Sequence, residues 1–402
     1  MTIGLSRTAA AAPIVVVGAG QCGATAAMTL RDLDSTSEIV LVGNEPLAAY
    51  ERPPLSKGVL LQPCEPTWVL EQQRYQALGI ELRLGERATG IDAANQVLTT
   101  ERGEIPYSAL ILATGGRPRI PPLSNKAAGA LITLRSWDDA CMLRDRLCRA
   151  RHVTVLGAGF IGMEVAAICR QRQLEVTVIE AAAAPLMRVL PPCVAEPLVQ
   201  LHVENGVQVL VNSVLSVITA SEDRWKVELQ SGETWLTDVV VAGIGLLPNV
   251  ELAAAAGCDT GDGIRVNEYA VTSCPGIFAA GDCAQFWHPH YRRHLRWETW
   301  QHAIRHGVHV ARSVLGAKDP YVEVARGWTD QYGVNVQFAG DPAGGSSILR
   351  RPVARGGCLY LAVRDDCVVG AVAWNAPREM RAATALIRDR ASPDGTATVS
   401  MQ

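Results

Sequence analysis

The sequence predicts an α/β protein with two dinucleotide-binding units and a further module after them. Two stretches carry this prediction, VVVGAGQCGATAA at 15–27 and VLGAGFIGMEVAA at 155–167. Each runs from β-branched residues through a Gly-x-Gly-x-x-Gly turn into a segment typical of a helix. The length of 402 residues leaves room for two or three domains, at roughly 150 residues each.

Composition narrows the class of protein. Hydrophobic residues make up 48% of the chain and charged residues 19%, which is typical of a globular protein. The net charge of −3 provides no basic field for nucleic acid. No apolar run approaches the roughly 18 residues of a membrane span, and the segment 13–17 is better explained as a tail and strand than as a signal peptide. We therefore expect a cytoplasmic protein that binds neither nucleic acid nor membrane.

The eleven cysteines are scattered from Cys22 to Cys367 without a Cys-x-x-Cys pair. This pattern argues against a disulfide framework, a zinc site and an iron–sulfur cluster. We expect most of these cysteines to be small buried hydrophobic residues in a reducing compartment.

The first unit is expected to begin with a strand at 14–18, followed by a helix that ends near Asp32 and a second strand at 39–42. Proline, glycine and charged residues at 43–67 indicate a loop. After strand and hairpin signals, a buried strand is expected at 110–113, and the prolines that follow mark a linker.

The second unit repeats this order. A helix is expected at 137–150, and strands are expected at 152–156, 175–179 and 239–241. The stretch GIFAAGDCA at 276–284 then indicates a buried strand that Gly and Asp end.

The last part of the chain has a different pattern. A helix is expected at 298–315, and from about Tyr321 short strand-like runs alternate with turns before a final helix near 378–388. This segment carries no glycine fingerprint, so it is expected to form a separate module.

Each glycine of the fingerprint has a physical role. The first permits a tight strand-to-helix turn, the second lets the backbone approach a pyrophosphate, and the third lets helix and strand pack closely. The N–H groups at the start of the helix then face the phosphates. The glycines in question are Gly18, Gly20 and Gly23 in the first copy and Gly157, Gly159 and Gly162 in the second.

An acidic residue after the second strand distinguishes the nucleotides. Glu180 ends the run EVTVIE, where its carboxylate would accept from a ribose 2′-OH and repel a 2′-phosphate, which favours NAD over NADP. The first copy has Gly43 at this position, with Asn44 and Glu45 after it, so contact with a ribose is less well defined there. Two cradles indicate two different dinucleotides, and FAD with NADH is the simplest pair because a flavin accepts the hydride that a nicotinamide gives.

Several motifs occur together and in order. They are ERPPLSK at 51–57, LILATGGRPR at 110–119, the second fingerprint with Glu164, VVVAGIGLLPN at 239–249, GIFAAGDCA at 276–284, RWETW at 296–300 and TDQY at 329–332. This set resembles the FAD- and NADH-dependent ferredoxin reductases of bacterial oxygenase systems, of the biphenyl dioxygenase and putidaredoxin reductase type. The resemblance covers residues 12–340 strongly and the rest more loosely.

The resemblance implies a glutathione-reductase-like fold with two Rossmann-type domains. The FAD-binding domain would comprise 1–117 and 245–320, the NAD-binding domain 118–244 and an α+β C-terminal domain 321–402. It also implies electron transfer from NADH through FAD to a [2Fe–2S] ferredoxin that serves a ring-hydroxylating dioxygenase or a P450 in aromatic hydrocarbon catabolism.

The resemblance assigns residues as well. Lys57 and Glu164 would act near the flavin N5, where the hydride arrives. Besides Lys57, the FAD contacts would be Gly18, Gly20, Gly23, Asn44, Glu45, Arg52, Ala88, Thr114, Gly115, Arg135, Asp282 and Trp300. The NAD contacts would be Gly157, Gly159, Phe160, Ile161, Gly162, Glu180, Arg188, Gly243 and Gly245. Asn44 departs from the aspartate that such reductases usually have, so ribose affinity could differ.

Simpler explanations exist for the charged and aromatic candidates. A cation near the flavin stabilises its reduced anion, and a carboxylate can pair with that cation. However, Lys57 could be a surface lysine, Glu164 an exposed helix residue, Asp282 a turn former and Trp300 a core residue. A helix carrying His302, His306 and His309 has a spacing that suits metal ligands, but no carboxylate or cysteine completes a site, so no metal is expected.

The expected ferredoxin is acidic, so its docking face should be basic. Candidate side chains are Arg292, Arg293, Arg296, Arg305, Arg350, Arg351 and Arg355. An NADH oxidase or peroxide reductase is the competing enzyme, but that class generally needs a redox cysteine, and 49–57 contains none. A flavin-binding interaction protein is the non-enzymatic alternative. The sequence leaves the oligomeric state open.

Overall fold

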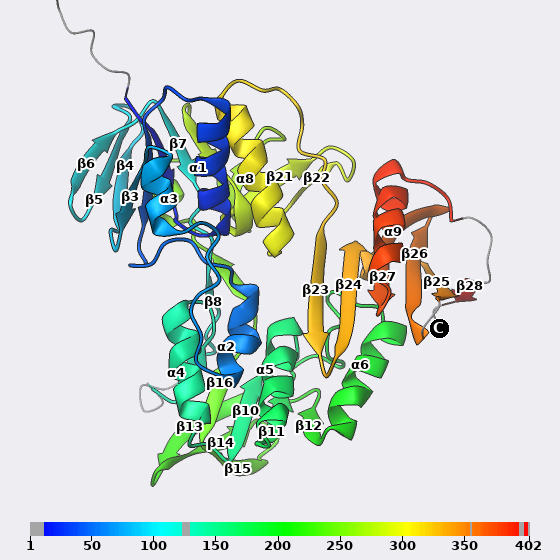
Figure 1. Ribbon diagram of the computed structural model, residues 1–402. Helices are drawn as coiled ribbons and strands as arrows, with labels where there is room; N and C mark the ends of the chain where they lie inside the picture. Colours follow the sequence, from blue (N-terminus) through cyan, green and yellow to red (C-terminus); the bar gives the residue numbers. More distant parts are fainter. Residues whose placement is uncertain (1–11, 123–128, 354–355, 394–397, 401–402) are drawn as a thin grey trace, which may run out of the picture. The chain divides into compact units, whose positions relative to one another are not determined.

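The computed structural model describes residues 12–122, 129–353, 356–393 and 398–400. The chain forms two compact units (Figure 1). The first comprises the described residues of Met1–Glu51, Pro66–Gly116 and Pro248–Glu323, and the second those of Arg52–Glu65, Arg117–Leu247 and Val324–Gln402. The boundaries that the sequence suggests for three domains remain a prediction.

A five-stranded parallel sheet, in the order β20-β7-β1-β2-β3, forms the centre of the first unit. Its strands are β1 (Ile14–Val17), β2 (Ile39–Gly43), β3 (Ile80–Leu84), β7 (Ala109–Leu112) and β20 (Ile277–Ala279). Residues of β1 lie level with their partners, so that Val17 faces Val42 and Leu112. All five carboxyl ends therefore meet at one edge, where ligands bind in open α/β sheets.

The side chains of β1, β2 and β7 are buried on both faces, as expected for inner strands of a parallel sheet, whereas the edge strand β3 is largely half-buried or exposed. On one face lie the helices α1 (Gln21–Leu33), α3 (Gln72–Ala77) and α8 (Trp300–Val314), and Figure 1 shows α1 beside α8. This pair approaches closely because Gly307 has no side chain: a Cβ there would come within 2.6 Å of the carbonyl oxygen of Cys22.

The other face of this sheet is covered by strands. One sheet is antiparallel and contains β4 (Ala88–Asp92), β5 (Val97–Thr100) and β6 (Gly103–Pro106). The other contains β18 (Thr260–Gly261), β19 (Gly263–Val266), β21 (Ala284–His288) and β22 (Arg293–Leu295). Leu98, Ile105 and Phe286 from these sheets pack with Val15 and Val17 in one apolar cluster.

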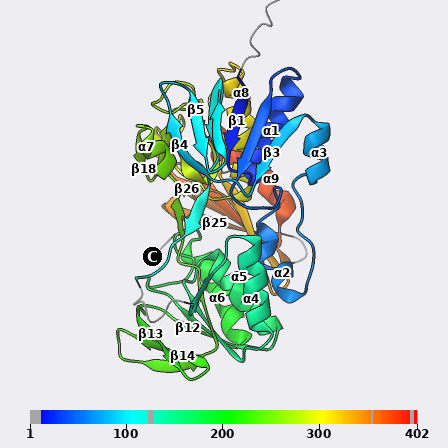
Figure 2. The same cartoon turned by 90° about the vertical axis from the view of Figure 1, so that its left-hand side faces the viewer.

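The second unit contains another parallel sheet, in the order β12-β11-β10-β16-β9. Its strands are β9 (Leu131–Thr133), β10 (His152–Leu156), β11 (Glu175–Ile179), β12 (Val207–Leu210) and β16 (Val239–Ala242). The helices α4 (Trp137–Leu147), α5 (Phe160–Gln171) and α6 (Pro192–Glu204) pack against these strands. An antiparallel sheet of β13 (Leu215–Ser221), β14 (Arg224–Leu229) and β15 (Thr234–Thr237) covers the opposite face, and Figure 2 shows β13 beside β14.

The second unit also includes the C-terminal module. Its sheet has the order β23-β24-β27-β26-β25-β28 and is antiparallel throughout. The strands are β23 (Arg326–Gln331), β24 (Val334–Gly340), β25 (Ser347–Pro352), β26 (Cys358–Arg364), β27 (Cys367–Trp374) and β28 (Thr398–Ser400). Helix α9 (Pro377–Asp389) places Met380, Ala383 and Ile387 on this sheet at a helical spacing of three and four.

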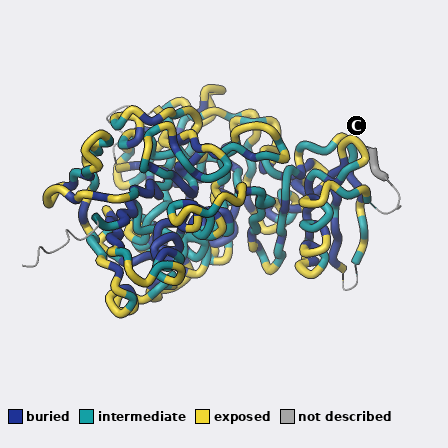
Figure 3. Tube along the Cα trace, turned by 90° about the horizontal axis from the view of Figure 1, so that it is seen from above, coloured by how far each residue is buried: buried dark blue, intermediate teal, exposed yellow. Residues whose placement is uncertain are grey.

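The remaining elements are short. They are η1 (Pro53–Ser56), α2 (Gly58–Leu61), β8 (Gly116–Pro118), β17 (Leu246–Pro248), α7 (Glu251–Ala255), η3 (Gly281–Cys283) and η4 (Pro342–Gly344). In Figure 3, buried segments of the trace lie mainly in the interior and exposed segments mainly at the periphery. Within the described ranges, no helix combines the length and the apolar character that crossing a bilayer requires.

The fold class predicted from the sequence is confirmed, and both glycine turns join a strand to a helix as expected. The expectation for the cysteines is partly wrong. All eleven are free thiols, but only five are buried, and Cys64, Cys148 and Cys193 are exposed. These three lie on helix surfaces or loops, where a small thiol is tolerated without burial.

Candidate functional site

The first glycine cradle lies at the carboxyl end of β1. Gly18 has φ of +113°, and a Cβ there would lie 2.1 Å from the carbonyl oxygen of Ala113. A Cβ on Gly23 would lie 1.9 Å from the oxygen of Gly18. A Cβ on Gly20, in contrast, would meet nothing within 4 Å. Packing therefore explains the outer two glycines, whereas the middle one leaves backbone accessible to a ligand.

The second cradle has the same arrangement. A Cβ on Gly157 would lie 2.6 Å from the oxygen of Gly243, and one on Gly162 would lie 2.0 Å from the oxygen of Gly157. Gly159 again has open space in front of it. Neither α1 nor α5 has a side chain that caps its first N–H groups. Both helix starts therefore fit a pyrophosphate, which uncapped N–H groups can bind.

Other strand ends of the first unit surround its cradle. After β2, Glu45 accepts a hydrogen bond from the Tyr50 hydroxyl. After β7, Thr114 donates to the carbonyl oxygen of Asn249 (2.8 Å), and the Asn249 side chain donates to the carbonyl oxygen of Thr114 (2.9 Å). Gly115 follows with φ of +63°. These contacts fix the loop on which the predicted FAD contacts Thr114 and Gly115 lie.

The predicted FAD contacts Asp282 and Trp300 also belong to the first unit. Asp282 is half-buried in η3, directly after β20, and the N–H of Gly281 donates to Nδ1 of His306 (3.1 Å). Trp300 is the first residue of α8 and is half-buried, with Thr299 as the N-cap. Neither residue is buried as completely as a core residue, so both keep accessible surface.

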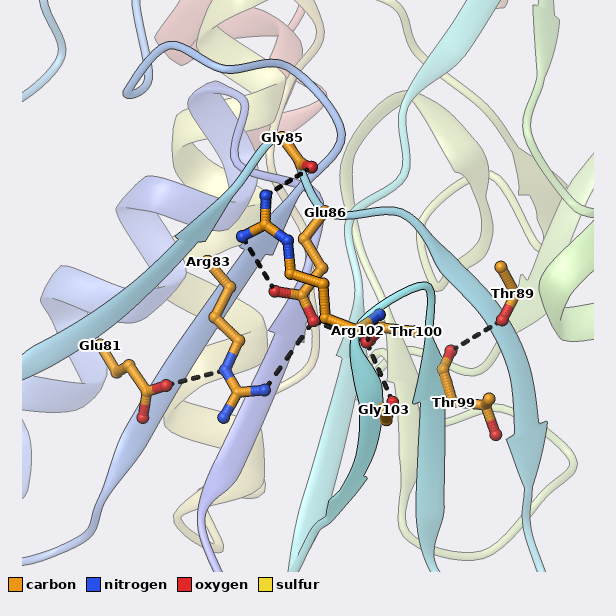
Figure 4. Close-up of polar contacts among 9 residues, drawn as sticks. All are labelled: Glu81, Arg83, Gly85, Glu86, Thr89, Thr99, Thr100, Arg102 and Gly103. Carbon is orange, nitrogen blue, oxygen red and sulfur yellow. Dashed lines mark hydrogen bonds and ion pairs between the residues drawn. The ribbon is translucent and has the colours of Figure 1, made fainter.

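A buried carboxylate supports the loop after β2. Figure 4 shows Glu86 between Arg83 and Arg102, with carboxylate–guanidinium distances of 3.8 and 3.6 Å, and the Thr100 hydroxyl donates to it (2.6 Å). The backbone N–H of Glu86 donates to the carbonyl oxygen of Gly43 (2.9 Å).

This cluster therefore fixes the end of β2, where the predicted contacts Asn44 and Glu45 begin. The N–H of Gly85 adds a second tie, since it donates to the carbonyl oxygen of Glu45 (2.9 Å). Ala88, another predicted contact, is half-buried at the start of the neighbouring β4. Sequence reasoning missed Glu86, because nothing marks one glutamate in a charged segment as buried.

The second cradle gathers the predicted NAD contacts. The carboxylate of Glu180, at the end of β11, accepts from the N–H groups of Ala158 (2.7 Å) and Ala182 (2.8 Å). A Cβ on Gly245 would lie 3.8 Å from the Arg188 guanidinium. Gly243 packs against Gly157, so the structure brings Glu180, Gly157 and Gly243 to one edge of the sheet.

The first two residues of α5 differ in exposure. Ile161 is 45% exposed. The Phe160 ring stacks on Phe338 of β24, with ring centroids 5.6 Å apart. Phe160 is therefore partly engaged by the C-terminal module, while Ile161 lies open beside Gly159.

Lys57 and Glu164 form a hydrogen-bonded polar group in the second unit. Nζ of Lys57 lies 2.8 Å from Oε1 of Glu164, whose side chain is 2% exposed. Thr329 donates to the same oxygen (2.7 Å), and Ser56 donates to Oε2. Glu164 is therefore not an exposed helix residue and Lys57 is not a free surface lysine. These partners replace the hydrogen bonds to water that a carboxylate loses on burial.

Arg52 and Arg135 come together in the same unit. Arg52 is the residue before η1, and its guanidinium donates to the carbonyl oxygen of Arg135. The N–H of Arg135 donates to Asp139 (2.9 Å), which also closes the capping box at Ser136. The start of α4 thus holds both arginines beside the segment that carries Lys57.

The histidines of α8 are part of an aromatic core. Burial lowers the pKa of His302 to about 4 and that of His306 well below its usual value. His302 stacks on Phe286 and its Nδ1 lies 2.9 Å from the Tyr321 hydroxyl. Among the residues that the structure describes, no group of three His, Cys, Asp or Glu side chains could hold a metal ion.

The candidate docking cations differ in exposure. The Arg296 side chain is only 9% exposed and pairs with Asp262 (3.1 Å) and Glu298 (2.6 Å), so it is poorly placed to meet a partner. Arg292 and Arg293 are exposed in the first unit, as is Arg305, which lies 3.9 Å from Glu323. In the second unit Arg350 is exposed and Arg351 half-buried, and Arg355 lies outside the described residues.

The thiols near the first cradle are unreactive. Burial raises the pKa of both the Cys22 thiol in α1 and the Cys283 thiol in η3, so both remain protonated at neutral pH. With every cysteine free, no disulfide is present for redox chemistry. The residues present instead fit two dinucleotides, because both middle glycines expose backbone at uncapped helix starts.

Comparisons with known proteins agree with this arrangement. The family model described as pyridine nucleotide-disulphide oxidoreductase matches residues 12–307, and a reductase C-terminal model matches residues 327–400. The chain is 40% identical over 388 residues to the anthranilate 1,2-dioxygenase system ferredoxin–NAD(+) reductase component of Burkholderia cepacia, with 95% of each protein covered.

Solved structures are similar over most of the chain as well. The ferredoxin reductase for the CYP199A2 system of Rhodopseudomonas palustris has a TM-score of 0.91 at 32% identity and covers 95% of both chains. A chain of the covalent putidaredoxin reductase–putidaredoxin complex has a TM-score of 0.90 at 33% identity, covering 94% of this chain and 93% of that one.

Proposed function

The chain belongs to the pyridine nucleotide-disulphide oxidoreductases, and from this premise we propose that it is a ferredoxin–NAD(+) reductase. It passes electrons from NADH through FAD to a [2Fe–2S] ferredoxin that serves an oxygenase, either a ring-hydroxylating dioxygenase or a P450. The carrying observation is that two cradles with open middle glycines occur in one chain in which Lys57 pairs with the buried Glu164 and every cysteine is free.

The two cofactors have separate sites in this proposal. FAD occupies the cradle of Gly18, Gly20 and Gly23, with Glu45, Thr114 and Asp282 at the neighbouring strand ends. NADH occupies the cradle of Gly157, Gly159 and Gly162. Bound FAD accepts a hydride from NADH and can release the two electrons one at a time. The FAD domain then corresponds to 1–117 and 245–320, the NAD domain to 118–244 and the C-terminal domain to 321–402.

Lys57 and Glu164 support the redox step through charge. The Lys57 ammonium stabilises negative charge that develops on the acceptor, and the Glu164 carboxylate orients this ammonium from 2.8 Å away. The carboxylate in turn is held by hydroxyl donors on both oxygens. Arg52 and Arg135 contribute further positive charge from the same unit.

Glu180 gives selectivity for NADH. Its carboxylate already accepts two backbone N–H groups, which hold it at the edge of the second sheet. A 2′-phosphate would meet this negative charge, whereas a 2′-OH can donate to it.

The enzymatic proposal is tested by adding NADH anaerobically to the FAD-loaded protein. We expect rapid bleaching of the visible flavin absorbance, and Glu164→Gln should slow it at least about tenfold, since a charge-assisted hydrogen bond contributes about 1.5–3 kcal/mol. Glu175→Gln, on the exposed first residue of β11, is the matched control and should bleach at the wild-type rate. Absence of bleaching in the wild type would support a flavin-binding interaction protein instead.

The competing enzymatic function is an NADH oxidase or peroxide reductase. The segment 49–57 contains no cysteine, and Lys57 there is paired with Glu164. We therefore expect the reduced protein to transfer electrons to a [2Fe–2S] ferredoxin much faster than to oxygen or peroxide. Equal or faster reoxidation by oxygen contradicts the ferredoxin assignment.

The ferredoxin is expected to be acidic and to dock by charge in the cytoplasm. Arg292, Arg293 and Arg305 are the exposed candidates of the first unit, and Arg350 is one in the second. Ferredoxin reduction should slow as ionic strength rises, because screening weakens attraction between exposed charges. A rate that does not fall with salt excludes electrostatic docking.

A further inference from the structure

A chain of hydrogen bonds leads away from Glu164 into the second unit. Thr329 and Gln331 lie two residues apart on β23 and therefore project to the same face. Nε2 of Gln331 lies 2.8 Å from the Thr329 hydroxyl, and Oε1 of Gln331 lies 2.5 Å from Nε2 of His202 on α6. The Tyr332 hydroxyl lies 3.4 Å from Nδ1 of His202.

Every link in this chain has a defined direction. The Gln331 amide nitrogen can only donate, so the Thr329 oxygen accepts from it and the single Thr329 proton is directed to Glu164. The Gln331 oxygen can only accept, so His202 carries its proton on Nε2. Burial lowers the pKa of His202, which keeps the ring neutral with Nδ1 as an acceptor for Tyr332. All donors therefore point toward the Glu164 carboxylate.

Burial makes this arrangement costly to disrupt. Glu164, Thr329, Gln331 and His202 are each at most 3% exposed, so water cannot replace a lost partner at low cost. A buried polar chain stabilises one geometry only when all its members are satisfied. The same face of α5 is anchored one turn earlier, where Phe160 stacks on Phe338.

We propose that Thr329, Gln331 and His202 are positioning residues that hold the Glu164 carboxylate in the orientation in which it binds Lys57. Thr329 fixes Oε1, the oxygen that Lys57 also contacts, and Gln331 fixes the direction of the Thr329 proton. His202 fixes the orientation of the Gln331 amide. The C-terminal module thus takes part in the charge arrangement of the redox site, and its catalytic meaning rests on the proposed function.

The test measures the reactivity of Lys57 in the FAD-loaded protein. An ammonium paired with a carboxylate reacts slowly with an acylating reagent, so labelling with acetic anhydride, quantified by mass spectrometry, reports how well Glu164 engages Lys57. The exposed Lys318 serves as the internal reference. We expect Glu164→Gln to raise the relative labelling rate of Lys57 about tenfold, and Thr329→Val to raise it about threefold or more.

Two variants separate positioning from general damage. Thr329→Ser keeps the hydroxyl and should label as the wild type does. Thr154→Val is the matched control, because Thr154 is equally buried in the same unit and accepts a hydrogen bond from Trp235 (2.9 Å) rather than contacting Glu164. Its labelling rate should equal that of the wild type.

A double-mutant cycle tests whether Thr329 acts through Glu164. In the Glu164→Gln background, Thr329→Val should change Lys57 labelling less than about 1.5-fold, since the interaction is already lost. Gln331→Met should raise labelling about twofold in the wild-type background. If the effects of Glu164→Gln and Thr329→Val on Lys57 labelling are additive, the proposal is overturned. If Gln331→Met labels Lys57 at the wild-type rate, only Thr329 positions Glu164 and the three-residue chain is overturned.

The readout needs no turnover, so the two proposals fail separately. If labelling follows these expectations but no ferredoxin is reduced, the proposed function is wrong and the positioning chain stands. If ferredoxin is reduced but Thr329→Val labels as the wild type does, the positioning chain is wrong and the proposed function stands.

Discussion

The buried histidines of α8 make the stability of the first unit depend on pH. His302 is 3% exposed, and its ring lies against Phe286 and beside the Tyr321 hydroxyl. Burial lowers its pKa from 6.5 to about 4, although the nearby charge of Asp282 acts in the opposite direction. Protonation therefore requires placing a charge among aromatic rings.

The sign of the effect follows from the two pKa values. Below pH 6.5 the His302 side chain of the unfolded protein binds a proton, whereas that of the folded protein does so only near pH 4. The contribution of His302 to the free energy of unfolding is therefore fully present above pH 6.5 and is lost as the pH falls toward 4. From these values, His302 alone reduces the free energy of unfolding by about 2 kcal/mol at pH 5. His306 adds to this loss, since its pKa is also lowered.

We expect His302→Phe to remove the part of the pH dependence of the free energy of unfolding that comes from His302. Phenylalanine keeps the ring packing, and loss of the contact with the Tyr321 hydroxyl costs stability equally at all these pH values. Urea unfolding of the FAD-loaded protein, at fixed excess FAD, should show the wild type losing about 2 kcal/mol more than His302→Phe between pH 7.5 and 5. His290→Phe, at an exposed position, is the control. A wild type and His302→Phe that lose stability in parallel would refute the reasoning.

The remaining predictions concern the two cradles. Gly159→Ala should weaken NAD⁺ binding at least about tenfold in calorimetry with an unchanged Tm, because its Cβ meets no protein atom. Gly157→Ala should instead lower the Tm, since its φ is +93° and its Cβ would lie 2.6 Å from the Gly243 oxygen. Glu180→Ala should raise kcat/KM for NADPH relative to NADH, and an unchanged ratio argues against charge repulsion. Glu86→Gln should lower the free energy of unfolding by about 1–3 kcal/mol in urea, because it removes the charged acceptor of the buried Thr100 hydroxyl and the carboxylate that Arg83 and Arg102 face.

Local patterns were sufficient to predict the parallel sheets. The strand 152–156 and the strand 175–179 were predicted residue for residue. Each is a short apolar run next to a glycine turn, and buried parallel strands have this signature. The helix predicted at 298–315 is observed at Trp300–Val314, and its N-cap Thr299 lies within the predicted range.

The antiparallel elements and α6 were harder to predict. The strands β13–β15 mix apolar with polar residues, and β14 also with charged ones, since only one face packs on the sheet. Helix α6 contains Pro197 in its interior, a residue that normally argues against a helix. In both cases packing against the parallel sheet determines the structure, and a local pattern does not contain that information.

The candidate site likewise contains residues that a local sequence pattern predicts and residues that it does not. The cradle glycines are adjacent in sequence, so a motif reveals them. The partners of Glu164, in contrast, are 108 and 165 residues away in the cases of Ser56 and Thr329. TDQY was recognised as part of a set of motifs, but no role could be assigned to Thr329 or Gln331, and nothing in the sequence marks His202.

Helix α5 explains why binding and charge placement are linked in this protein. Its first turn provides the uncapped N–H groups of the second cradle, and Glu164 lies five residues after Gly159, about 7.5 Å along the axis at 1.5 Å per residue. The position of this helix depends on Gly162, where a Cβ would lie 2.0 Å from the Gly157 oxygen. A side chain at 162 would therefore displace the phosphate-binding N–H groups and the Glu164 carboxylate together. NAD⁺ affinity and Lys57 labelling should then change in the same variant, whereas Gly159→Ala should change only the affinity.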